Sequence, residues 1–294
     1  MNTIKALTIR NLKLFFRDKA LVFFSFLSVM IILGLYVLFL GDINVANIKS
    51  LVGQDLPGIE ALVYGWMLPG VIAISTVTLA LGNMGRLVDD ARDESLYDFM
   101  VSPMSRAQLI ISYVLSTILI AALISGLMFI ASIFIVKFKG GSYLTLDQIL
   151  SASGIILLLI ISSSLMSLLI ASFVQSPNTY GVVNSIGGTF IGFVTGAYMP
   201  MGIMPVVIQN IFNSLPVSQG ASILRQIFLR DIIKDVFMGA PESVVADYRY
   251  FQGIDLKILG HILTLNEMMI SIFVGIILLF LLSVLRFKNL TKKV

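Results

Sequence analysis

The sequence predicts an all-α integral membrane protein with six transmembrane helices, and three observations support this fold class. Apolar residues make up 57% of the 294 positions and charged residues 12%, against about 25% charged in an average soluble domain. The mean hydropathy is +0.98, and a soluble fold could not hide that much apolar surface, since a chain of this length still exposes part of its surface to water. Uncharged stretches long enough to cross a bilayer also recur along the chain.

The composition excludes several classes of catalytic centre. The chain has no cysteine and one histidine, which rules out thiolate nucleophiles, iron–sulfur clusters and multi-histidine metal sites. That histidine, His261, is accompanied by no G-x-S-x-G motif, so a serine hydrolase is not expected either. The net charge of +4 arises from basic residues beside apolar stretches, which favours an anionic membrane surface over nucleic acid.

Each crossing of a hydrocarbon core of roughly 30 Å needs about 20 apolar residues. The chain is interpreted as one transmembrane domain, 1–294, with spans at 20–40, 61–85, 108–136, 148–174, 178–198 and 268–285. The first span is too long for the core of a signal peptide and lacks a small-residue cleavage site, so it is interpreted as retained. Pro69 and Gly70 predict a kink in the second.

The uncharged stretch over 178–224 decides the number of spans, because it is too long for one. Three prolines interrupt its second half: Pro200, Pro205 and Pro216. Since proline breaks helix interiors, we expect a span to about Tyr198 and then, over 199–224, a re-entrant hairpin that does not cross. Its buried apolar stripe is expected to comprise Val206, Val207, Ile211, Phe212 and Leu215. Two full spans are the alternative.

Lysines and arginines near the ends of the chain predict its orientation. The basic residues at the two ends are Lys5, Arg10, Lys13, Arg17 and Lys19, and Arg286, Lys288, Lys292 and Lys293. Both termini are therefore expected in the cytoplasm of a plasma-membrane protein, which requires an even number of crossings and supports six. The loop over 86–106 then lies inside, and the segment over 225–267 is extracellular.

Residues 1–19 predict an amphipathic helix in the headgroup plane. One face carries Arg10, Lys13 and Arg17, and the opposite face carries Ile4, Leu7, Leu14 and Phe15. Lys5, Ile9 and Phe16 depart from this pattern. A plain basic anchor is the alternative.

The predicted cytoplasmic loop over 86–106 is the most charged stretch of the chain, yet it interleaves large apolar residues. Leu96, Tyr97 and Met100 fall at helical spacing on one side, and Pro103 ends the helix. A short amphipathic helix that projects into the cytoplasm should bury its apolar side. It packs either on the ends of its own spans or on a cytosolic partner.

This segment resembles the coupling helix of the type-2 ABC exporter permeases, in which Arg-x-Glu leads into a helix that ends in Ser-Pro-x-Ser-Arg. The matching residues are Arg92, Glu94, Leu96, Ser102, Pro103, Ser105 and Arg106. Ser95 stands where the family has Gly-Thr. A second stretch resembles the proline-rich re-entrant hairpin of that family between spans five and six. Its matching residues are Gly196, Pro200, Pro205, Pro216 and Arg225.

The resemblance implies the membrane subunit of a bacterial ABC exporter, paired with a second permease as a homodimer or a homologous heterodimer. It also implies two copies of an ATP-binding subunit, one docked on each coupling helix. The implied docking residues are Arg92, Asp93, Glu94, Leu96, Tyr97, Phe99, Met100, Pro103 and Arg106. The chain has no G-x-x-x-x-G-K-[ST] motif, so ATP and Mg are expected on the separate subunit. No catalytic residue, cofactor or metal is expected here.

Small and polar residues within the spans have two interpretations each. Gly188, Gly192 and Gly196 form overlapping G-x-x-x-G steps, a spacing that lets helices approach closely, within one subunit or between two. The serines of the fourth span either line a polar path or bond back to their own helix; they are Ser162, Ser163, Ser164 and Ser167. Tyr64 and Trp66 are expected at the membrane interface.

None of the predicted spans contains an ionisable residue. This argues against an ion-coupled secondary transporter, because ionisable groups do the coupling in such proteins. An uncharged pathway favours an amphipathic or lipid-like substrate: a drug, an antimicrobial peptide or a lipid-linked molecule, with resistance to such compounds as the role. A non-transporting scaffold for a cytosolic partner and a self-sufficient secondary transporter remain as alternatives.

Overall fold

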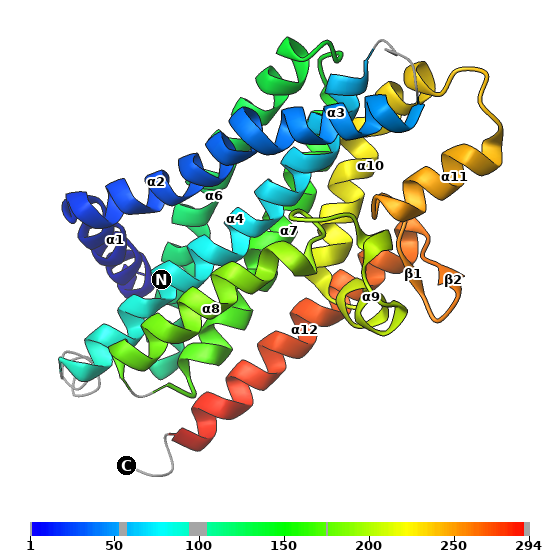
Figure 1. Cartoon of the computed structure of the whole chain (residues 1–294). Coiled ribbons are helices and arrows are strands. Elements are labelled where there is room, and N and C mark those ends of the chain that lie inside the picture. Colours follow the sequence, from blue (N-terminus) through cyan, green and yellow to red (C-terminus); the bar gives the residue numbers. More distant parts are fainter. Residues whose placement is uncertain (1, 53–57, 94–104, 175, 291–294) are drawn as a thin grey trace.

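The computed structural model describes residues 2–52, 58–93, 105–174 and 176–290, and these form a helical bundle with one small β-hairpin (Figure 1). In chain order the elements are α1 (Asn2–Arg17), α2 (Lys19–Leu35), the π-helical segment η1 (Tyr36–Leu40), α3 (Gly41–Val52), α4 (Ile59–Arg92), α6 (Arg106–Phe138), α7 (Leu146–Ala171), α8 (Pro177–Val194), the 3₁₀ turn η2 (Met201–Ile203), α9 (Val206–Asn213), α10 (Pro216–Val236), α11 (Glu242–Phe251), β1 (Lys257–Ile258), β2 (His261–Ile262) and α12 (Leu265–Leu290). The two strands pair antiparallel.

Local capping chemistry sets where several of these helices begin. Ser105 and Gln108 form a capping box at the start of α6, and Thr145 and Gln148 form a second one at the start of α7. In each box the hydroxyl and the amide side chain satisfy backbone N–H groups that have no intrahelical partner. Ser176 caps α8 through its hydroxyl alone, which accepts from Thr179 N, and proline stands at the first helical position, where its missing N–H costs nothing.

Among the described residues, four helices are long and apolar enough to cross a membrane: α4, α6, α7 and α12. They coincide with the predicted spans at 61–85, 108–136, 148–174 and 268–285, which confirms an all-α, multi-pass membrane protein. The predicted first span corresponds to α2 and η1, and the helical path runs on through α3 to Val52. The predicted fifth span corresponds to α8. Neither is among the four, so the count of six stays a prediction.

Helix α4 is the centre of the bundle. Within its most apolar window, 94% of the residues are buried inside the protein, against 17% for α12. It packs against α6, α7, α8 and α10. It also continues to Arg92, beyond the predicted end at Gly85, and so carries ionisable residues into a membrane-spanning helix. The predicted span itself, 61–85, has no acidic or basic residue, and Arg86, Asp89, Asp90 and Arg92 lie beyond it on the same helix.

The segment over 199–224 contains η2, α9 and the first part of α10. Helix α10 runs on to Val236, well into the stretch predicted as an extracellular segment. The predicted apolar stripe is wrong for four of its five members, since only Phe212 is buried, while Val206 and Val207 are 66% and 69% exposed. The opposite side of α9 faces the protein because its amide side chains bond there. Gln209 donates to the Met204 carbonyl and Asn213 donates to the Lys257 carbonyl.

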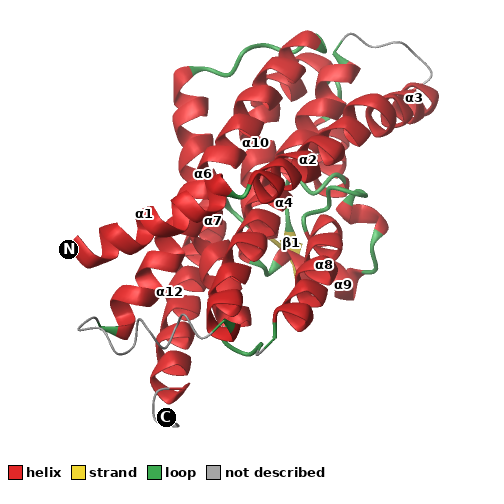
Figure 2. Cartoon of the chain, turned by 90° about the vertical axis from the view of Figure 1, so that its left-hand side faces the viewer, coloured by secondary structure: helices red, strands yellow, loops and turns green. Residues whose placement is uncertain are grey.

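The bundle has two distinct ends (Figures 1 and 2). Helix α1, the last turn of α4, the first turn of α6 and the C-terminal end of α12 lie at one end, which we call the inner end. Helices α3 and α11 and the β1–β2 hairpin lie at the opposite, outer end. A polar centre lies at each end, and both centres involve α4.

Candidate functional site

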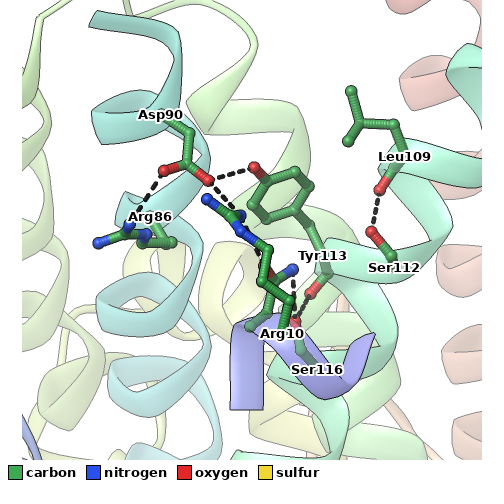
Figure 3. A network of polar contacts seen from close by, with 8 residues as sticks. Arg10, Arg86, Asp90, Leu109, Ser112, Tyr113 and Ser116 are labelled. Atoms are coloured by element: carbon green, nitrogen blue, oxygen red, sulfur yellow. Dashed lines mark hydrogen bonds and ion pairs between the residues drawn. The ribbon is translucent and has the colours of Figure 1, made fainter. Parts of the chain in front are cut away.

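The carboxylate of Asp90, in the last turn of α4, is the polar centre of the inner end (Figure 3). Its side chain is 2% exposed. One oxygen, Oδ2, accepts hydrogen bonds from Arg10 Nη1 at 2.8 Å and from the Tyr113 hydroxyl at 2.5 Å. The other, Oδ1, lies 3.1 Å from Arg86 Nη2. One buried carboxylate thus joins α1, α4 and α6.

Each partner of Asp90 reaches it for a local reason. Arg86 is four residues earlier on the same helix, a spacing that brings two side chains together. Tyr113 lies in the second turn of α6, whose start the capping box fixes. Arg10 comes from α1. Burial disfavours the charge of the Arg10 guanidinium, but the hydrogen bond and charge of Asp90 outweigh that effect, and the pKa of Arg10 is raised. Arg10 therefore stays charged at any accessible pH.

An apolar layer continues this junction. It gathers side chains from five helices: Leu7, Met84, Leu87, Val88, Leu109, Tyr113, Leu168, Ala171 and Tyr180. Asn11 of α1 adds a 3.4 Å hydrogen bond from Nδ2 to the Ser116 hydroxyl of α6. Helix α1 is therefore packed against the bundle through a face that includes polar groups.

The buried and exposed faces of α1 differ from those predicted from the sequence. Its buried residues are Leu7, Thr8, Asn11 and Phe15. Arg10 was predicted on the basic face with Lys13 and Arg17, and it instead turns inward to Asp90. The outward face carries Lys5, Ile9, Lys13, Phe16 and Arg17. The three residues that departed from the sequence pattern are thus all on the exposed side.

The Asp90 junction lies where the two helices that flank the predicted docking segment, α4 and α6, meet that segment. Arg92 and Asp93 at the end of α4, and Arg106 at the start of α6, are all exposed. The other predicted docking residues lie outside the described residues: Glu94, Leu96, Tyr97, Phe99, Met100 and Pro103. What the structure does place is the pair of packed helices from which this segment extends.

Arg225 of α10 forms the polar centre of the outer end, and it is 0% exposed. Its guanidinium donates to three backbone carbonyls: Nε to Trp66 at 3.1 Å, Nη2 to Gly196 at 3.0 Å and Nη1 to Gly253 at 3.3 Å. Gly196 follows α8 and Gly253 follows α11, and both have positive φ, at 62° and 66°. Arg225 matches a family motif in the sequence, but its burial is not predicted by that motif.

Arg225 is one of several donors that hold the segment over 252–257, which connects α11 to β1. Trp66 Nε1 donates to the Gln252 carbonyl at 2.6 Å, and the Ser222 hydroxyl donates to that of Ile254 at 2.7 Å. Asn213 Nδ2 reaches the Lys257 carbonyl at 3.0 Å. The apolar side chains of this segment point into the core, with Ile254 0% exposed. The outer segment is thus fastened to α4, α9 and α10.

Two aromatic residues predicted at the membrane interface are inside the protein instead. Trp66 is 3% exposed and Tyr64 is 0% exposed. Each satisfies its polar atom internally, since the Tyr64 hydroxyl donates to the Val37 carbonyl at 2.9 Å. The sequence cannot separate these cases, because a belt residue and a buried one both combine an apolar ring with one polar atom.

The small residues of α8 lie against their own chain. A Cβ on Gly188 would be 3.5 Å from Thr78 of α4, an ordinary contact, whereas a Cβ on Gly192 would overlap the ring of Tyr198.

The serines of α7 are buried as well: Ser162, Ser163, Ser164 and Ser167. Ser167 donates to its own helix at 2.8 Å. Among the described residues, no cluster of three or more His, Asp or Glu is placed to hold a metal ion.

The sequence of this chain also matches a known protein family. A family model described as ABC-2 type transporter matches residues 2–229. The matched region runs from α1 through most of α10, so it includes both Asp90 and Arg225 and ends before α11. No curated protein matches the chain.

Replacing Arg225 should destabilise the protein strongly. Arg225→Met removes three hydrogen bonds and leaves buried carbonyls unpaired, and breaking such a buried charged centre costs about 3 kcal/mol or more. The matched control is Arg230→Met on the same helix, whose side chain is 46% exposed in surface ion pairs and which should change stability by less than about 0.5 kcal/mol. Thermal unfolding in detergent measures both. Equal shifts would show that Arg225 is no structural centre.

The two α8 glycines should differ in their tolerance of a methyl group. Gly192→Ala is expected to lower the unfolding temperature because the new Cβ meets the Tyr198 ring, and Tyr198→Ala in the same chain should restore part of the loss. Gly188→Ala is the control and should be nearly neutral. If Gly192→Ala instead leaves the unfolding temperature unchanged and reduces the fraction of dimer in size-exclusion chromatography, the glycine serves a subunit interface.

Proposed function

From the premise that this chain belongs to the ABC-2 type transporter family and is a multi-pass permease of an ABC transporter, we propose that it exports its substrate in complex with two ATP-binding subunits. A permease of this family is not itself catalytic, and binding of ATP and Mg is assigned to the partner subunits. Their closure on ATP would supply the differential affinity that shifts the membrane halves between two states.

The segment between α4 and α6 is the proposed docking surface. The observation that carries this assignment is the Asp90 junction, which braces both flanking helices and α1 at the root of the segment. A docking segment that extends from two packed helices can pass a displacement into the bundle. The proposed contact residues are Arg92, Asp93, Glu94, Leu96, Tyr97, Phe99, Met100, Pro103 and Arg106.

The proposed topology has six crossings with both termini in the cytoplasm. The position of α1 and of the C-terminal end of α12 at the inner end of the bundle supports an even number of crossings (Figure 1). In this topology the segment from η2 to β2 forms the outer cap, and Pro200, Pro205 and Pro216 delimit its re-entrant part. A second permease, identical or homologous, completes the transporter.

The proposed substrate is amphipathic or lipid-like. The bundle does bury ionisable groups, but the Asp90 carboxylate is held by two arginines and a tyrosine. Both oxygens of this carboxylate are bonded to side chains of the protein, so it holds helices together. This supports movement that is driven from outside the bilayer over a self-sufficient secondary transporter.

Co-purification tests the proposed docking. The chain is co-expressed with ABC ATP-binding subunits from its own genome, and we expect one of them to co-purify at one copy per permease. Glu94→Ala and Tyr97→Ala should weaken the complex about tenfold, the loss of roughly 1.4 kcal/mol of binding free energy. Glu242→Ala and Tyr143→Ala are matched controls, since both residues are exposed at the outer end.

Either of two outcomes would contradict this proposal. If no ATP-binding subunit is retained, a membrane scaffold or a self-sufficient transporter becomes the better account. If a subunit is retained but the outer-end variants weaken it as much as the inner-end variants, docking does not take place between α4 and α6.

A further inference from the structure

Helix α2 has a wide apolar face that points away from the bundle. Several of its large apolar side chains are between 43% and 59% exposed: Leu21, Phe23, Met30, Ile31 and Leu35. Such a surface suits lipid. On its other side, Val22, Phe26 and Leu33 pack against the core. Hydrogen bonds also hold α2 near each of its two ends.

The inner end of α2 is held through α1. Only Asp18 separates the two helices, which meet at a corner (Figure 1). Backbone hydrogen bonds continue through this corner, from Asp18 N to the Leu14 carbonyl and from Val22 N to that of Asp18. The Asp18 carboxylate also accepts from Leu21 N at 2.9 Å. A displacement of α1 is consequently passed to the start of α2.

The outer end of α2 is held by Tyr64 of α4. The Tyr64 hydroxyl bonds to the Val37 carbonyl in the π-helical segment that extends α2. Gly41 lies so close to the Tyr64 ring that a Cβ there would overlap it. Helix α4 therefore touches the α1–α3 unit at Tyr64 and at Asp90, two points about 39 Å apart along the helix at 1.5 Å per residue.

The inner attachment differs in kind from the apolar packing around it. Apolar contacts are non-directional and let helices slide, whereas the charge-assisted bond of 2.8 Å between Arg10 and Asp90 fixes one position. Arg86 bonds to the same carboxylate from α4 itself. It therefore contributes charge without joining two helices.

We propose that Arg10 and Asp90 are positioning residues that make the first span, α2, follow the inner end of α4 during transport. This inference rests on the proposed function. Asp90 is two residues from the end of α4, so any displacement that a docked partner imposes on the following segment moves this carboxylate. The ion pair carries α1 with it, the corner at Asp18 carries α2, and the Tyr64 contact keeps the outer ends together.

A spin-label distance measurement on the complex of permease and ATP-binding subunit tests the inference without any knowledge of the substrate. The chain has no native cysteine, so Leu21→Cys on α2 and Leu157→Cys on α7, both exposed, place two unique labels. In the otherwise wild-type chain, ATP with vanadate is expected to shift the distance between them. Arg10→Gln should abolish this shift, while the ATP-binding subunit stays bound and the distance without ATP stays unchanged.

The matched control is Arg86→Gln, which should keep the shift because α1 remains tied to α4. Arg10→Lys retains the charge and should restore the shift at least in part. Should Arg10→Gln fail to fold, Asp90→Asn removes the charge while keeping an acceptor, and it is expected to give the same loss.

The outcomes distinguish a failure of the role proposed for the ion pair from a failure of the proposed function. A shift that persists in folded Arg10→Gln and Asp90→Asn would overturn the role of the ion pair and leave the proposed function intact. Loss of the shift in Arg86→Gln as well would mean that charge balance at Asp90, and not the tie to α1, is what matters. Failure of the wild-type chain to retain any ATP-binding subunit would refute the proposed function itself.

Discussion

A charged group buried in this apolar bundle must find its partner inside the protein, and that requirement arranges the helices around α4. An unpaired buried charge costs several kcal/mol, and neither lipid nor a neighbouring apolar side chain offsets this cost. Asp90 meets the requirement by drawing Arg10 from α1 and Tyr113 from α6 to the end of α4. The inner end of the bundle is organised by this one carboxylate.

The outer end follows the same rule with the opposite charge. The last carbonyls of a helix have no intrahelical donor and carry the negative end of the helix dipole. Arg225 donates to two carbonyls just beyond such helix ends, at Gly196 after α8 and at Gly253 after α11. Both positions have positive φ, which glycine adopts without strain. A buried guanidinium with fork-like donors can therefore bring the ends of several helices together.

Helix α4 contributes to both polar centres, the one at Asp90 and the one at Arg225. Asp90 and Trp66 are both on α4, about 36 Å apart along its axis at 1.5 Å per residue. The Asp90 centre joins the helices that flank the proposed docking segment, and the Arg225 centre holds the segment over 252–257 at the opposite end. A single helix, α4, thus connects the two ends of the bundle.

The sequence by itself determined the membrane class, four of the spans and the family. It did so because long uncharged stretches and a proline- and glycine-punctuated motif are local signals. Tertiary structure decided the rest: the exposed stripe on α9, the burial of Trp66 and Arg225, and the turn of Arg10 toward Asp90. Lipid is as apolar as a protein core, so an apolar residue does not reveal which of the two it faces. Backbone carbonyls, the partners of Arg225, occur at every position and leave no mark in the sequence.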